Sequence, residues 1–363
     1  MGMTHIQTKD TASRNAFIMR TCTAWLIVIL GVAALAAEDV PPLKLASFDG
    51  DNLPLNKAGA TYPNQYAPAG QATVTLERSG GVSGGCVAFE LTSGNFYPQF
   101  NAHNADGTRG FAREYIAGTW RFDTYNRMSF WIQVPTNARP LDRAGRETIQ
   151  FGTYVKGIRD QDSHSDETGG GHWYHHLNLP ATGTWTRVVL NMHPHHLRGA
   201  SGGTEHGNQP HPTKEGQYNY FDTLTRFYME AIGKPSSYPA IYRLDEFVFY
   251  REPHEEADEQ VYSIAATYVP SERRLILTWS RNKNEDKVSH EVRYAFESIH
   301  VIGWDKALPA PGGIVTPPGV GGYNGMVYSA TDVPLDGKQV IFLAIRPEGA
   351  TRFSQIELPI LRR

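Results

Sequence analysis

Histidine and tyrosine alternate with apolar and aromatic residues in one stretch of the chain, GHWYHHLNL, where the third residue is a tryptophan. Because side chains on a β-strand alternate between its two faces, His172, Tyr174 and His176 fall on one face and Trp173 and Leu177 on the other. Imidazole and phenol groups can transfer protons or hydrogen-bond to hydroxyl groups, and an aromatic ring can lie under the C–H face of a sugar. The pattern therefore predicts a strand face that binds a ligand or carries out proton transfer.

Three other segments, 127–134, 148–156 and 224–232, alternate in the same way and are expected to be strands of the same sheet face. The residues expected to contact a ligand on this face are Trp131, Gln150, Tyr154, Lys156, His172, Tyr174, His176, Arg226 and Tyr228. Gln133 and Glu230 fall on the same face. Aromatic rings combined with amide and charged groups suit a carbohydrate, and the basic members suit an acidic one. The pattern also fits a sheet face that is only solvated or covered by loops.

The same residues permit catalysis. Removal of the proton beside a uronate carboxylate needs a base, for which Tyr174 or His176 is the candidate, and a cation that neutralises the carboxylate, for which Lys156 or Arg226 is the candidate. The sequence Tyr-Val-Lys-Gly at 154–157 loosely resembles a motif of β-jelly-roll polysaccharide lyases, although the companion motifs of that family are missing. A lyase acting by β-elimination is therefore an alternative hypothesis.

Histidines are concentrated in one region, since eight of the fourteen lie between His172 and His211. Clustered imidazoles can bind Zn²⁺ or Cu²⁺. His172 and His176, however, would lie about 13 Å apart on a strand at ~3.3 Å per residue, too far to share one metal. His193 and His195 are spaced better for a metal. Loop histidines that hydrogen-bond to the backbone are the preferred interpretation.

Composition sets the fold class. The chain has 35 glycines, 23 prolines and 11% aromatic residues, and it lacks a long amphipathic helical pattern. These features predict an all-β protein with many turns. Strand spacing predicts a jelly-roll β-sandwich over residues 40–252, a charged linker over 253–260 and a smaller immunoglobulin-like sandwich over 261–363.

Short motifs carry two family resemblances. Phe-Asp-Gly-Asp at 48–51 and Leu-Asp-Glu-Phe-Val-Phe at 244–249 resemble the terminal strands of jelly-roll carbohydrate-binding modules with the galactose-binding-like fold. That resemblance implies a structural Ca²⁺ held by Asp49, Asp51 and Asp245, whose hard oxygen ligands suit the ion. The alternative is an acidic turn without metal.

The C-terminal segment resembles a fibronectin type III module in its strand rhythm and in Trp279, although Phe342 replaces the usual late-strand tyrosine.

The N-terminal segment predicts export. Arg14 and Arg20 precede an apolar run at 24–36 that ends in Ala-Leu-Ala, which is typical of a secretory signal peptide covering residues 1–37. An uncleaved membrane anchor is the alternative. We expect the mature protein outside the cytoplasm, either secreted or in the cell envelope. Cys86 would then be the remaining cysteine, so no intrachain disulfide can form.

Charge limits the class of partner. Loss of residues 1–37 removes three basic residues and one acidic residue from totals of 34 and 37, which leaves 31 basic against 36 acidic side chains. This balance argues against nucleic acid or an anionic membrane as partner. The preferred hypothesis is a secreted polysaccharide-binding protein without catalytic activity. A polysaccharide lyase and a purely structural envelope or adhesion protein are the alternatives.

Overall fold

Strands account for almost all of the regular structure. The computed structural model describes residues 41–46, 48, 72–101, 126–139, 147–158, 171–191, 223–253, 261–281, 288–317, 325–333, 335 and 337–361. Within these ranges the only other elements are the four-residue helix α3 (Ile299–Ile302) and the 3₁₀ turns η1 (Thr136–Ala138), η4 (Pro270–Glu272) and η5 (Trp304–Lys306). The predicted all-β class is confirmed.

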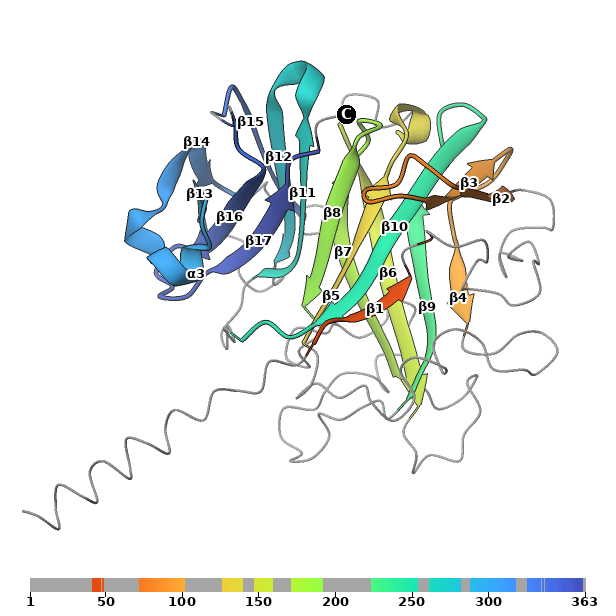
Figure 1. The fold of residues 1–363 in the computed structure, drawn as a ribbon, viewed down its shortest axis with the longest axis horizontal. Coiled ribbons are helices and arrows are strands. Elements are labelled where there is room, and N and C mark those ends of the chain that lie inside the picture. Colours follow the sequence, from red (N-terminus) through yellow and green to blue (C-terminus); the bar gives the residue numbers. More distant parts are fainter. Residues whose placement is uncertain are drawn as a thin grey trace, which may run out of the picture. The chain divides into compact units, whose positions relative to one another are not determined.

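The described strands form three antiparallel sheets (Figure 1). Sheet A contains, in spatial order, β15 (Gly325–Thr331), β12 (Arg274–Arg281), β11 (Val261–Val269), β8 (Trp185–Asn191), β5 (Arg127–Gln133), β10 (Ala240–Tyr250), β3 (Cys86–Leu91) and β2 (Ala72–Glu77), with β1 (Leu43–Ala46) paired to β10. Sheet B contains β4 (Gln99–Asn101), β9 (Thr223–Ile232), β6 (Thr148–Ile158) and β7 (Gly171–Pro180). Sheet C contains β14 (Leu308–Val315), β13 (His290–Ala295), β16 (Val340–Pro347) and β17 (Ser354–Pro359).

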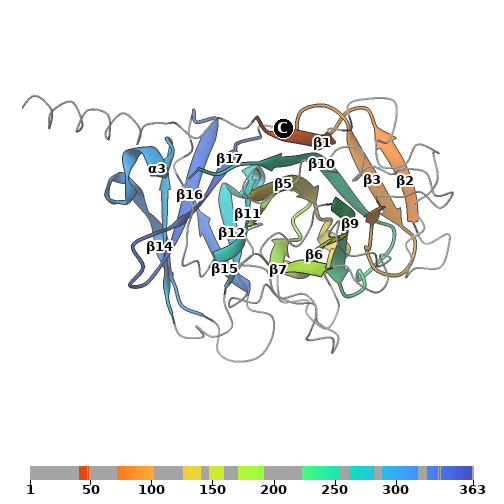
Figure 2. The same cartoon turned by 90° about the horizontal axis from the view of Figure 1, so that it is seen from below.

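Aromatic side chains join sheet B to sheet A, and Figure 2 shows β6 and β7 in one layer with β5 and β10 in another. Phe96 stacks on Tyr242 of β10 with ring centroids 4.1 Å apart, and its ring lies 6.3 Å from that of Phe151 of β6. All three side chains are fully buried. Complete burial of side chains of this size stabilises the fold by about 1.5–3 kcal/mol each, so this stack is a main contact between the two sheets.

Strand β11 contributes to two cores through its two faces. Ala265 lies opposite Thr278 of β12, whose hydroxyl donates a hydrogen bond of 2.5 Å to the carbonyl of Asn178 in sheet B. The neighbouring residue Ile264 instead belongs to a buried cluster that includes Ile356 of sheet C. Because adjacent residues of a strand point to opposite faces, sheets B and C pack on opposite faces of sheet A.

The join between the two halves of sheet A is a strand pairing between β8 and β11. Five consecutive residues of β11, Ser263–Thr267, pair with Thr186–Leu190. The Thr267 hydroxyl also donates a 2.8 Å hydrogen bond to the Trp185 carbonyl, and Arg187 donates a 2.5 Å hydrogen bond to the Glu357 carbonyl of β17. These bonds connect β8 to both β11 and sheet C.

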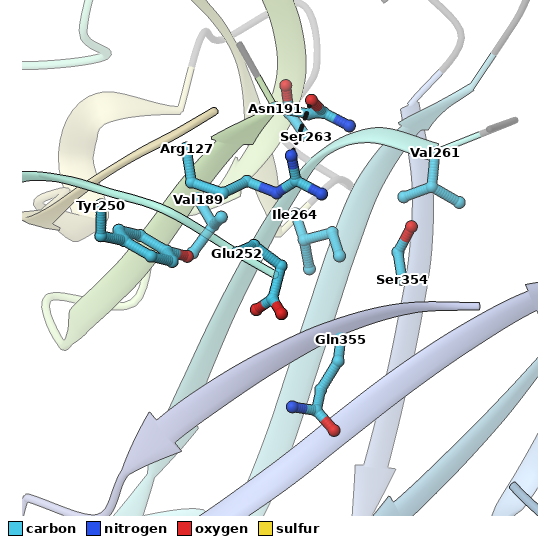
Figure 3. A pocket seen from close by; sticks show the side chains of 10 residues that line it. All are labelled: Arg127, Val189, Asn191, Tyr250, Glu252, Val261, Ser263, Ile264, Ser354 and Gln355. Carbon is cyan, nitrogen blue, oxygen red and sulfur yellow. Dashed lines mark hydrogen bonds between the residues drawn. The ribbon is translucent and has the colours of Figure 1, made fainter. Parts of the chain in front are cut away.

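A polar cluster lies at the end of this pairing (Figure 3). The Arg127 guanidinium is buried and donates hydrogen bonds to the Asn191 side chain at 2.9 Å and to the Asn126 carbonyl at 3.0 Å. The Asn126 side-chain amide in turn donates to the Glu252 carbonyl at 2.9 Å and accepts from the Glu252 N–H at 2.7 Å. It thus pairs with the backbone of Glu252 in the way that the backbone of a neighbouring strand does. A cavity of about 20 Å³ beside Arg127 is lined by residues on both sides of the join, including Gln355, and a space of this size holds one water molecule.

Sheet A is continuous across the predicted linker at 253–260, most of which falls outside the described residues. The division of the chain into two domains there stays a prediction. The predicted signal peptide at 1–37 also falls outside the described residues. In the part of the chain that the structure describes, helices are too short to cross a bilayer.

Because β11 belongs to both cores, we expect residues 42–363 to unfold in one concerted transition when followed by far-ultraviolet circular dichroism and by tryptophan fluorescence. Ala265→Asp would place an uncompensated charge at a fully buried position and should lower the unfolding free energy by at least about 3 kcal/mol for both probes together. Ser329→Asp, at an exposed position of β15, is the matched control. Two separate transitions would contradict a shared core.

Candidate functional site

Strand β6 lies between β9 and β7 at the centre of sheet B and sets the register of the candidate site. Its residues Ile149, Phe151 and Thr153 are buried. Phe151 lies opposite Ala231 of β9 and Thr153 opposite Met229, and both partners are buried too. By strand alternation, the even-numbered positions of β6 belong to the other face. We call this the outer face of sheet B.

Four residues occupy one row across the outer face. Tyr154 lies opposite Tyr174 of β7 and opposite Tyr228 of β9, and Tyr228 lies opposite Gln99 of β4. Directly opposite residues share a face and have Cβ atoms about 4.5–5.5 Å apart. This tyrosine row (Gln99, Tyr228, Tyr154 and Tyr174) therefore places three phenol-bearing residues on neighbouring strands.

A second row lies two residues further along the strands. Lys156 is opposite His172 on one side and Arg226 on the other, and Arg226 is opposite Asn101. At ~3.3 Å per residue, this basic row (Asn101, Arg226, Lys156 and His172) lies about 7 Å from the tyrosine row. The register therefore puts the basic candidates beside the tyrosine candidates.

The row on the other side of the tyrosines has a glycine at its centre. Gly152 lies opposite His176 of β7 and opposite Glu230 of β9. A glycine inside a strand often marks a place where a ligand approaches the backbone closely. Next to it, Gln150 lies opposite Asn178, and the side-chain amide oxygen Oε1 of Gln150 is buried and accepts no hydrogen bond from the described residues. Gly152 is itself buried, and Gln150 is half-buried.

Trp131 is not part of this face, so the prediction that it shares a sheet with Tyr154 is wrong. It lies on β5 in sheet A, is 6% exposed and belongs to the buried cluster that contains Trp185 and Trp279. The loop between β2 and β3 approaches the same cluster, since the Trp185 indole donates a 3.1 Å hydrogen bond to the Gly80 carbonyl. Both indoles therefore act as core side chains.

Gln133 also lies in sheet A, where its side chain is hydrogen-bonded within a polar cluster. Arg243 donates to both oxygens of Glu77, at 2.7 and 3.0 Å, and to the Gln133 side chain at 3.0 Å. The Arg243 hydrogen bond lowers the pKa of Glu77. Burial, followed by the charge of Glu77, raises the pKa of the Cys86 thiol to about 12. Cys86 is therefore protonated at neutral pH and unsuited to act as a nucleophile.

Asp245, one of the three predicted calcium ligands, is fully buried at a bulge in β10. Its carboxylate accepts hydrogen bonds from the N–H groups of Val82 at 2.6 Å and Glu246 at 2.8 Å. The loop before β3 passes so close that a Cβ added at Gly85 would lie 2.3 Å from the Phe48 carbonyl oxygen. A buried carboxylate and a backbone carbonyl thus approach one loop, and both are donor types that Ca²⁺ accepts.

The other two predicted calcium ligands, Asp49 and Asp51, lie outside the described residues. So do the loop histidines His193 and His195. Among the residues that the structure describes, no three His, Cys, Asp or Glu side chains are grouped so that they could hold a metal ion. The predicted metal sites therefore stay predictions.

The strand that carries His172, Tyr174 and His176 is held in place by the C-terminal strands. Its residue Asn178 accepts the hydrogen bond from Thr278 of β12, and a Cβ added at Gly325 of β15 would lie 2.3 Å from the Asn178 amide nitrogen. Gly325 therefore allows β15 to approach β7 closely. Strands β12 and β15 thus support one side of the candidate site.

Comparison with known proteins gives little further guidance. No protein-family model and no curated protein matches the chain. A search of solved structures finds the glycoside hydrolase domain of Endo-D from Streptococcus pneumoniae, which is 7% identical, with 80% of this chain and 36% of that chain covered and a TM-score of 0.23. The match thus spans about a third of the length of that domain's chain. A likeness at this TM-score supports no inference about fold or activity.

Since Trp131 is a core residue, Trp131→Ala should lower the unfolding free energy by about 3–5 kcal/mol, as measured by urea denaturation. Val327→Ala, at a 40% exposed position of β15, should change stability little and serves as the control. An unchanged denaturation midpoint in Trp131→Ala, combined with weaker retention by a glycan, would instead place Trp131 in a binding site.

Proposed function

We propose that the outer face of sheet B binds a polysaccharide. The observation that carries this proposal is the tyrosine row, in which Tyr154 lies directly opposite Tyr174 and Tyr228 on the two neighbouring strands. Aromatic residues offer large contact area to the C–H faces of sugar rings, and their hydroxyl groups can hydrogen-bond to sugar hydroxyls. A row that crosses three strands offers such groups to an extended ligand.

The neighbouring rows supply the polar groups that a sugar needs. Gln150 adds an amide, and His176 and Glu230 add groups that accept or donate hydrogen bonds. These groups fix the orientation of a ligand that the tyrosines hold. The proposal concerns recognition and requires no reaction.

A second function, polysaccharide lyase activity, is favoured by one observation. Tyr174, the candidate base, pairs in the row next to that of Lys156 and Arg226, the candidate neutralising residues, which supports this alternative. In such a reaction, a base would remove the proton beside the uronate carboxylate, and the cations would stabilise the developing negative charge. Product formation separates this function from binding alone.

We propose in addition that Asp245 and the Phe48 carbonyl hold a structural Ca²⁺ together with Asp49 and Asp51. The burial of Asp245 and the close approach of Phe48 to Gly85 support this assignment. When bound, Ca²⁺ would neutralise a buried carboxylate and tie the first and last strands of the predicted jelly roll together.

We also propose that the protein is exported and that its C-terminal strands form a separate type of module. The apolar run that ends at Ala36 supports export through a signal peptide. The arrangement of β11, β12 and β15 against β14, β13, β16 and β17 supports a fibronectin type III-like module. Because this module contacts β7, we propose that it supports the binding face rather than acting only as a spacer.

Tyr154→Ala removes the central ring of the tyrosine row and should weaken binding to a retained polysaccharide by at least about tenfold, a change of ~1.4 kcal/mol. The measurement is affinity electrophoresis in gels that contain single polysaccharides. Tyr238→Ala, at a 37% exposed residue before β10, is the control and should migrate like the unmodified protein. Equal retardation of both variants would contradict binding by the tyrosine row.

The ultraviolet absorbance of the same polysaccharide solutions distinguishes binding from β-elimination, because elimination leaves an absorbing unsaturated end. A sustained rise that is lost in Tyr174→Phe while retardation persists would assign lyase activity. A flat trace with retardation leaves recognition as the function.

Ca²⁺ should raise the thermal unfolding midpoint of the protein by several degrees relative to a chelator, and Asp245→Asn should abolish that difference. The measurement is a thermal melt in calcium and in chelator for both proteins. Asp332→Asn, at an exposed residue, is the control. A melt that is unaffected by calcium in the unmodified protein would contradict the assignment.

A further inference from the structure

The basic row is an exception to the charge balance of the protein. The whole chain has a formal net charge of −3, yet Lys156 lies directly opposite both His172 and Arg226. Among the described positions of the outer face of sheet B, the one carboxylate is that of Glu230, two rows and about 13 Å away along the strands. Positive charge is thus concentrated at one end of this face.

Such a row is unfavourable by itself. Like charges at directly opposite positions of neighbouring strands destabilise a sheet, and Lys156 has a basic residue opposite it on each side. An anionic group placed over the row would remove this repulsion. Arginine is well suited to that role because its planar guanidinium can donate two parallel hydrogen bonds to a carboxylate or sulfate.

We propose that the polysaccharide bound by this protein is acidic, and that the basic row is the subsite for its anionic group. The proposal rests on the proposed function, since it takes the tyrosine row to hold the sugar ring. The two rows are about 7 Å apart, so a ring over Tyr154 can direct its carboxylate or sulfate toward Lys156 and Arg226. Asn101 of β4 lies at the end of this row, opposite Arg226.

The direction of the ligand follows from the order of the rows. Gln150, Gly152, Tyr154 and Lys156 succeed one another along β6, so an amide, a glycine, an aromatic and a basic position follow in this order along the strand. A sugar chain that lies along β6 would therefore place an anionic group at one end and hydroxyl groups near Gln150 at the other. This asymmetry predicts that anionic groups matter in one subsite more than in the others.

The test compares three ligands by isothermal titration calorimetry with the full chain. They are a polyuronate, the same polymer with its carboxyl groups reduced to alcohols, and a sulfated form of that neutral polymer. We expect the polyuronate to bind at least about tenfold more tightly than the reduced polymer, as a charge-assisted hydrogen bond predicts. The sulfated polymer then shows whether the subsite takes carboxylate alone or either anion.

Two variants assign the difference to the basic row. Lys156→Gln and Arg226→Gln should each weaken polyuronate binding by about tenfold to a hundredfold and weaken binding of the reduced polymer by a much smaller factor. Arg226→Lys, which keeps the charge, should recover part of the loss. Lys234→Gln, at an exposed position after β9, is the matched control and should bind like the unmodified protein. Circular dichroism verifies that each variant is folded.

Three binding results would contradict the acidic subsite or the proposed function, and they can be told apart. Equal affinity for the polyuronate and the reduced polymer would overturn the acidic subsite and leave polysaccharide binding intact. Failure to bind any of the three ligands, with Tyr154→Ala behaving like the unmodified protein in gels, would overturn the proposed function itself. Equal affinity for single-stranded DNA and for the polyuronate would show a general polyanion surface and overturn a glycan subsite.

Discussion

The pairing of β8 with β11 is the interaction on which the rest of the structure depends. It turns two groups of strands into one sheet whose opposite faces are covered by sheets B and C. Small residues such as Ala265 and Ala266 lie at the join and leave room for packing on both sides. Because sheet B is supported at β7 by the strands beyond this join, the geometry of the candidate site depends on a part of the chain far from it in sequence.

The candidate site depends on a second constraint, the register of β6 with its two neighbours. Strand alternation in the sequence is enough to assign Tyr154 and Lys156 to one face and Phe151 and Thr153 to the other. Alternation within a strand cannot show which residues of other strands lie opposite. The rows that join Tyr174 to Tyr228 and His172 to Arg226 follow only from the pairing of β7, β6 and β9. The rows therefore add the spatial arrangement of residues whose types alone the sequence supplies.

The sequence predicted the all-β class and most strands because alternation and turn residues are local signals. Trp131 shows where local signals fail. It alternates correctly with Phe130 and Ile132, but whether its face is solvated depends on the β2–β3 loop and on sheet C, which come from distant parts of the chain. Strand β4 was missed for a related reason, since three residues are too few for a periodic pattern. Gln99 and Asn101 therefore join the outer face only through their pairing with β9.

The anchoring on both sides of residues 254–260 has a consequence for proteolysis. Glu252 is held by the Asn126 side chain, and Val261 begins a strand that pairs with β8 and β12. A protease that cut the peptide chain between these two anchors would leave the strand pairings of the described residues on both sides intact. The two fragments would stay together as a nicked complex. Separately produced halves of the chain could assemble in the same way, with the edge of β8 as the template for β11.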